Sequence, residues 1–114
     1  MKDIRVYLTH ALECIARIER YTVGGEPTFV GSEMVQDAVV RNLQTLGQSL
    51  AQLPLNLKDA HAEIDWRSIT GFRNVLVHGY LGVNLSRVWE IVQNDVPVLK
   101  RALETMRKEL DRQP

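Results

Sequence analysis

Apolar residues recur every three to four positions along most of this 114-residue chain, and this period constrains the fold more than any other feature. Two stretches of that kind, residues 3–21 and 32–53, are each long enough for a helix of about five or six turns. No stretch alternates apolar and polar residues as a half-buried strand does. The sequence therefore predicts an all-α protein, built as a bundle of four to five helices.

Breaks in that period divide the first half of the chain into helices and loops. Glycine and proline interrupt it early and predict a loop over residues 22–31, which contains Gly24, Gly25, Pro27 and Gly31. Ser32 follows directly and is the expected N-cap of the second long helix. Pro54 ends that helix at about residue 53, so residues 54–64 are expected to form a second loop.

Three further helices are predicted in the second half of the chain. Asp65 is the expected cap of a helix over residues 66–78. Either Asn84 or Ser86 starts a shorter helix, and Asp95 begins the last one. Apolar residues of the last helix are spaced by three and four positions, which is typical of a helix packed lengthwise against another: Val96, Leu99, Leu103, Met106 and Leu110.

The length and charge of the chain limit what it can do. A chain of this size fits one domain over residues 1–114, and it leaves little room for an enclosed active site, which favours a cleft between subunits. Fourteen Lys and Arg residues balance fourteen Asp and Glu residues, so there is no global basic field for nucleic acid. The net charge is nonetheless −3 over residues 26–64 and +2 over residues 96–114. The basic tail can touch phosphate, although such small offsets usually mark solvated helix faces.

The cysteine count and the lack of long apolar runs indicate the cellular compartment that we expect for this chain. The single Cys14 excludes an intrachain disulfide and a cysteine-based metal site, and its place on the apolar side of the first helix predicts a buried thiol. No run of about 18 apolar residues occurs, and the N-terminus lacks the apolar core of a signal peptide. We therefore expect a cytoplasmic protein with no membrane span.

Residues 73–80, here called the motif segment, read Arg-Asn-Val-Leu-Val-His-Gly-Tyr and concentrate reactive side chains. A guanidinium neutralises phosphate charge, and an imidazole with an ordinary pKa near ~6.5 exchanges a proton at neutral pH. On a helix, Arg73, Asn74 and His78 share one face, but Arg73 and His78 are about 140° apart. A second copy of the helix, facing the first across a two-fold axis, would bring these groups together more naturally than one chain does.

Residue types alone leave other interpretations open. A lone Arg and His on a helix are more often surface or interhelical hydrogen-bonding groups than catalysts, and Tyr80, just past the predicted helix, is ordinarily a half-buried aromatic. His10, His61 and His78 show no metal-ligand spacing, so neither a metal nor another cofactor is predicted. The chain has no Gly-rich phosphate loop and no Gly-x-Ser-x-Gly element, so nucleotide hydrolysis and serine hydrolase chemistry have no support.

The motif segment resembles the Arg-x4-His-x-Tyr motif of the HEPN superfamily in its small HepT toxin branch. The helical pattern of residues 36–53, the residues 65–72 before the motif and the Val88-Trp89-Glu90 and Val96-Pro97 runs after it resemble the same family, so the resemblance covers nearly the whole chain. It implies a HEPN-type bundle that forms a homodimer and places two Arg-x4-His motifs in one cleft. It also implies a metal-independent ribonuclease toxin, encoded beside a minimal nucleotidyltransferase antitoxin called MntA. That partner is expected to silence the toxin by transferring AMP from ATP to Tyr80.

The resemblance assigns roles that suit these residue types. RNA carries its own nucleophile, the 2′-hydroxyl, so positioning and proton transfer can cleave it without a metal. His78 would act as general base or acid, Arg73 would stabilise the negative charge of the transition state, and Asn74 would orient His78 or a phosphate oxygen. The alternative is a non-catalytic helical subunit that binds a minimal nucleotidyltransferase and uses Arg73 and His78 for hydrogen bonds or nucleotide contact.

Overall fold

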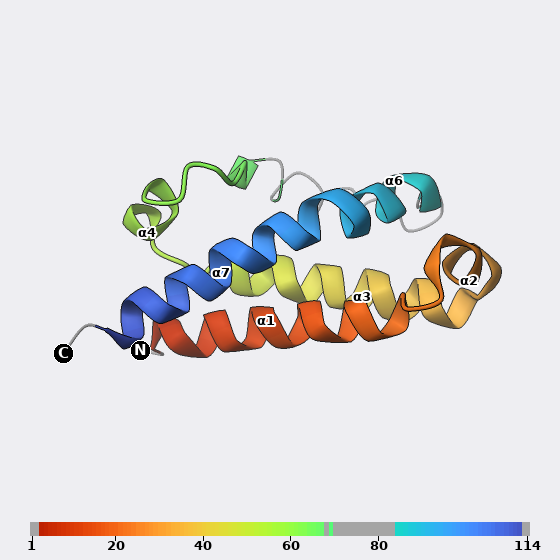
Figure 1. Ribbon diagram of the computed structural model, residues 1–114, viewed down its shortest axis with the longest axis horizontal. Coiled ribbons are helices and arrows are strands. Elements are labelled where there is room, and N and C mark those ends of the chain that lie inside the picture. The colour runs from red at the N-terminus through yellow and green to blue at the C-terminus, as the bar shows by residue number, and fades with distance from the viewer. Residues whose placement is uncertain (1–2, 68, 70–83, 113–114) are drawn as a thin grey trace.

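The computed structural model describes residues 3–67, 69 and 84–112, and every regular element within these ranges is helical (Figure 1). The predicted all-α fold is therefore confirmed over the described residues. In chain order the elements are α1 (Ile4–Tyr21), α2 (Gly25–Gly31), α3 (Glu33–Leu50), α4 (Leu55–Asp59), α6 (Leu85–Glu90), the π-helical turn η1 (Ile91–Asp95) and α7 (Val96–Asp111).

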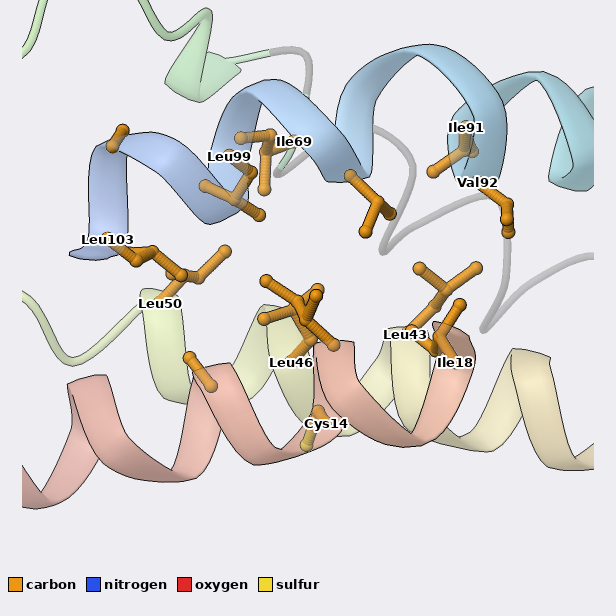
Figure 2. Packing of buried hydrophobic residues seen from close by; sticks show 14 of the residues in the cluster. Cys14, Ile18, Leu43, Leu46, Leu50, Ile69, Ile91, Val92, Leu99 and Leu103 are labelled. Atoms are coloured by element: carbon orange, nitrogen blue, oxygen red, sulfur yellow. The ribbon is translucent and has the colours of Figure 1, made fainter. Parts of the chain in front are cut away.

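The core lies between the three long helices, because each of them has a continuous apolar stripe. Helix α1 packs against both α3 and α7, and α7 crosses over the other two (Figure 1). Figure 2 shows Leu43 and Leu46 of α3 in the same interior as Ile18 of α1 and Leu99 of α7. Cys14 is also in this cluster, with no exposed surface, so the predicted buried thiol is confirmed. Burial raises the pKa of that thiol above its ordinary value.

Side-chain caps fix where three of the helices begin. The Asp3 carboxylate accepts a hydrogen bond from the backbone N–H of Arg5 at 2.9 Å, at the start of α1. The predicted Ser32 cap is confirmed, since its hydroxyl accepts from the N–H of Val35 at 3.2 Å. Asn84 rather than Ser86 caps α6, where its side-chain oxygen accepts from the N–H of Arg87 at 3.2 Å.

The prediction of a loop over residues 22–31 was wrong, because most of that stretch forms α2. Gly25 begins the helix with a φ of +81°, a left-handed conformation that favours glycine. Pro27 lies within the first turn of the helix, where its missing N–H costs no hydrogen bond. The fully buried Phe29 packs on the ring of Trp89, with 5.3 Å between the ring centroids. This contact with a residue 60 positions away stabilises a helix that local composition disfavours.

The prediction of a continuous loop over residues 54–64 was also wrong. Helix α3 ends at Leu50, and the backbone tightens into three-residue turns before Pro54, with the N–H of Leu53 donating to the carbonyl of Leu50 at 3.2 Å. Leu53 remains buried although it lies past the helix end. Pro54 then becomes the residue before a new short helix, α4.

Asp95 does not start a separate helix, which corrects another expectation. Residues 85–111 are helical without a break, and Asp95 has helical dihedral angles and makes no capping hydrogen bond. The N–H of Val96 donates to the carbonyl of Ile91, five residues back, so this turn of the helix contains one residue more than a regular α-helical turn. The wider turn precedes Pro97, which lacks an N–H and whose ring would clash with the carbonyl of Gln93 in a regular α-helix.

The described helices also bear on the membrane prediction. None of those in residues 3–67, 69 and 84–112 combines the length and the apolar character that a transmembrane segment needs.

Candidate functional site

The four residues predicted to form the site, Arg73, Asn74, His78 and Tyr80, lie outside the described residues. What the structure describes is the framework on either side of them, residues 65–67 and 69 before and Asn84 onward after. These two edges are the described residues that precede and follow the motif segment in the chain.

The helix predicted to carry the motif segment begins as expected. Trp66, Arg67 and Ile69 are helical, and the N–H of Ile69 donates to the carbonyl of Asp65 at 3.2 Å. Ile69 is 8% exposed and lies beside Leu99 of α7 in the core (Figure 2). The first turn of this helix is therefore held against α7 by apolar contact.

Trp66 ties the same turn to the segment that follows α4. Its indole N–H donates to the carbonyls of Lys58 at 3.0 Å and His61 at 3.2 Å. The Lys58 ammonium lies 5.9 Å from the centre of the indole ring, close enough for a cation–π contact. The backbone around His61 thus fixes the start of the helix that leads to the motif segment.

His61 connects that segment in turn to α7. The imidazole is buried, its Nδ1 lies 3.1 Å from a carboxylate oxygen of Glu63, and its Nε2 lies 3.4 Å from a carboxylate oxygen of Glu109. A hydrogen bond from its own backbone N–H and another from His61 hold the pKa of Glu63 below its ordinary value. Both ring nitrogens face carboxylates, so this histidine serves structure rather than metal binding.

A hollow of about 230 Å³ lies where this segment meets the beginning of α7. It is lined by Glu63, Ile64, Asp65, Ile69, Asp95 and Val98. Three of these six side chains are carboxylates, which repel a phosphate group. The hollow therefore adjoins the motif helix but is unsuited to RNA phosphate.

A second histidine lies on the face formed by α1 and α3. His10 Nδ1 is 2.6 Å from the Ser49 hydroxyl, beside an open depression of about 550 Å³. Ser49 is only 6% exposed, so this hydrogen bond ties α1 to α3 and leaves the hydroxyl poorly placed as a nucleophile. Over the described residues, no group of three His, Cys, Asp or Glu side chains could hold a metal ion.

Sequence reasoning missed one contact of each histidine because the partner is distant in the chain. Glu109 is 48 positions from His61, and Ser49 is 39 positions from His10. No local pattern links such pairs, since only the packing of α1 on α3 and of residues 60–65 on α7 brings them together.

Comparison with known proteins places the chain among ribonuclease relatives. The family described as "Ribonuclease HepT-like" matches residues 11–106, a range that includes the motif segment. A protein of Methanocaldococcus jannaschii named "Gamma-glutamylcyclotransferase and putative RNase" is 37% identical over 112 residues. That alignment covers 97% of this chain but only 50% of the relative, so the chain spans half the length of that protein.

Two other relatives are similar in length to this chain. A "Putative RNase" of Caldanaerobacter subterraneus is 36% identical, covering 96% of this chain and 99% of the relative. A "Probable ribonuclease HepT" of Thermococcus cleftensis is 36% identical, covering 90% of this chain and 94% of the relative. No solved structure matches the chain.

Proposed function

Because the chain belongs to the HepT-like ribonuclease family, we propose that it is a metal-independent endoribonuclease and the toxin of a toxin–antitoxin pair. The observation that carries the proposal is that the family match over residues 11–106 takes in the motif segment together with the helices that frame it. Relatives of nearly the same length that are named as ribonucleases support it.

The proposed site is composite and lies in a cleft between two copies of the chain. Arg73 and His78 fall about 140° apart on the predicted helix, so the Arg73 of one copy is proposed to act with the His78 of the other. The burial of Ile69 turns the apolar side of the first turn of this helix toward α7. On the predicted wheel, His78 then falls about 180° from Ile69, whereas Arg73 falls only about 40° from it, so the two groups do not converge on one copy.

The chemistry follows from the residue types. His78 removes the proton of the RNA 2′-hydroxyl or protonates the departing 5′-oxygen, a role typically worth about 10²–10⁴-fold in rate. Arg73 neutralises the charge that develops on the phosphorus-bound oxygens in the transition state. Asn74, one turn before His78 on the predicted helix, orients the imidazole or a phosphate oxygen. None of these roles requires a metal.

The experiment is RNA cleavage by purified protein in the presence of EDTA. Wild-type protein is expected to cleave, and His78→Ala and Arg73→Ala are each expected to lose the activity while keeping the helical circular-dichroism signal. Arg67→Ala is a matched control, because Arg67 lies on the same predicted helix but outside the motif segment. Cleavage by His78→Ala at the wild-type rate would refute the catalytic assignment.

Expression in cells separates this proposal from the alternative of a non-catalytic binding subunit. A ribonuclease toxin is expected to arrest growth, and its Arg73→Ala variant is not. A subunit that only binds a nucleotidyltransferase would be harmless in both forms.

We further propose that an MntA-type minimal nucleotidyltransferase controls the activity by transferring AMP to Tyr80. The phenol is two residues from His78, so the added phosphodiester and nucleotide would oppose RNA entry by repulsion and steric block. Intact-mass measurement after co-expression with the nucleotidyltransferase encoded nearby is expected to show adenylyl additions that disappear in Tyr80→Phe. Additions that persist in Tyr80→Phe would assign the acceptor to another residue.

A further inference from the structure

The outer side of α7 carries a line of cations. Arg101, Lys108 and Arg112 each lie within about 20° of a common direction around the helix axis, at steps of seven and four residues. All three are exposed. The buried residues of α7 are centred about 160° away, so this line, here called the α7 ridge, points directly out of the bundle.

The acidic residues of α7 lie to the two sides of the ridge, and two of them contact other groups. Glu109, about 80° to one side, lies 3.4 Å from the His61 ring. Asp111, about 80° to the other side, lies 3.3 Å from Nε of Arg5. Glu104 lies about 60° from the ridge and is partly buried. The balance of charge over the whole chain therefore conceals a local excess of positive charge.

The ridge cations differ from Lys100 of the same helix, which is bound to a carboxylate. Lys100 donates to both carboxylate oxygens of Glu19, at 3.0 and 3.1 Å, and so joins α7 to α1. None of the ion pairs among the described residues includes Arg101, Lys108 or Arg112. No ion pair of the described residues therefore fixes the positions of these three side chains.

We propose that the α7 ridge binds the phosphate backbone of single-stranded RNA. Charge complementarity selects this occupant, since a row of exposed cations with no apolar surface between them fits a row of phosphates better than it fits a protein surface. Arg101 and Lys108 are about 10 Å apart along the axis, and Lys108 and Arg112 about 6 Å, within reach of separate phosphates for long side chains. Thr105 lies between them and its hydroxyl donates to the carbonyl of Arg101, so the ridge has no bulky residue at its centre.

The proposed role of the α7 ridge rests on the proposed ribonuclease function and extends it. RNA would be held on α7 outside the cleft, and the same helix packs against Ile69 at the start of the motif helix (Figure 2). Contacts of this kind position the substrate without reading its sequence. The ridge is thus expected to favour long RNA over short fragments and not one sequence over another.

Binding of a labelled single-stranded oligoribonucleotide tests the ridge. The His78→Ala background prevents cleavage, and the ridge variant combines Arg101→Gln, Lys108→Gln and Arg112→Gln. The matched control combines Arg20→Gln, Arg41→Gln and Arg107→Gln, three exposed cations on other faces that change the net charge equally.

Three phosphate contacts predict a slope of about −2 for the logarithm of the binding constant against that of salt concentration. This corresponds to an additional loss of about 20-fold in affinity between 50 and 200 mM salt in the parent protein. The ridge variant is expected to lose that dependence, and the control to keep it.

The possible outcomes separate a failure of the ridge proposal from a failure of the proposed ribonuclease function. Equal binding by the ridge variant and the control would refute the ridge while leaving the nuclease proposal intact, and would mean that the cations serve only the helix C-terminus. Loss of nucleotidyltransferase binding by the ridge variant, with unchanged RNA binding, would assign the ridge to an acidic protein and refute the RNA proposal. Wild-type protein that neither binds nor cleaves RNA would refute both.

Discussion

Replacing Leu46 by alanine tests whether the core of the three long helices holds the fold together. Leu46 has no exposed surface and lies at the centre of the cluster in Figure 2. The change removes three carbons, worth about 2.4 kcal/mol at ~0.8 kcal/mol for each. The cavity left behind raises the expected loss of unfolding free energy to about 3–4 kcal/mol.

Leu55→Ala is the matched control, because it makes the same chemical change at a side chain that is 72% exposed. Only about a quarter of the side chain is removed from water there, so the expected loss is about 0.6 kcal/mol. Urea unfolding, followed by the helical circular-dichroism signal, measures the unfolding free energy of both variants. An unchanged slope of that free energy against urea concentration shows that the two variants can be compared.

In a thermal melt the same loss of unfolding free energy corresponds to a fall in melting temperature of about 12–16 °C for Leu46→Ala in a chain of this length. The fall expected for Leu55→Ala is about 2–3 °C. Equal losses in the two variants, or a loss of less than about 1 kcal/mol for Leu46→Ala, would refute the packing described for this core.

Three further predictions concern helix ends and the buried thiol. Asn84→Ala is expected to lower the unfolding free energy by about 1 kcal/mol, because its side chain caps α6. Ser86→Ala is expected to change it by less than about 0.5 kcal/mol, and the reverse order in urea unfolding would contradict the cap.

Cys14 is fully buried and its pKa is raised, so alkylation followed by mass spectrometry is expected to modify it only as fast as the protein unfolds. A hydrogen bond from the backbone N–H of Arg5 lowers the pKa of Asp3, so the stabilisation is present above pH about 4 and is lost as the pH falls below it. Asp3→Asn is expected to reduce that acid-induced loss in urea titrations at several pH values, and an unchanged pH profile would contradict the cap.

The sequence predicted those features that depend on neighbours along the chain. The apolar stripes gave the long helices, Ser32 marked the start of α3, and the position of Cys14 on its stripe gave its burial. Each of these follows from the helical period or from a side chain bonding to a backbone group three residues away. Such local rules hold wherever distant contacts agree with them.

The sequence failed where a distant contact decided the local structure. Gly25 and Pro27 are typical of a loop, yet the packing of Phe29 on Trp89 makes that stretch helical. Asp95 is a residue type that often caps helices, but the π-helical turn before Pro97 lets the helix continue through Asp95. No local pattern states either outcome, because each depends on how the chain packs against itself.

The candidate site divides in the same way. The chemistry of Arg73 and His78 could be proposed from residue types and from the resemblance to a family. The supports of that site could not, since they run from Trp66 through the carbonyl of His61 to Glu109 on α7. The His61 ring has no motif spacing to its carboxylate partners, so only the fold reveals the connection.

The most direct test of the central claim is complementation between inactive subunits. Arg73→Ala and His78→Ala chains carrying different affinity tags are co-expressed, mixed dimers are purified through both tags, and RNA cleavage is measured in EDTA beside wild-type protein. A mixed dimer keeps one Arg73 and one His78 on opposite chains, so a site shared between two copies predicts that cleavage returns although each parent is inactive. Mixed dimers as inactive as their parents, beside an active wild-type protein, would contradict a site built from the Arg73 of one copy and the His78 of the other.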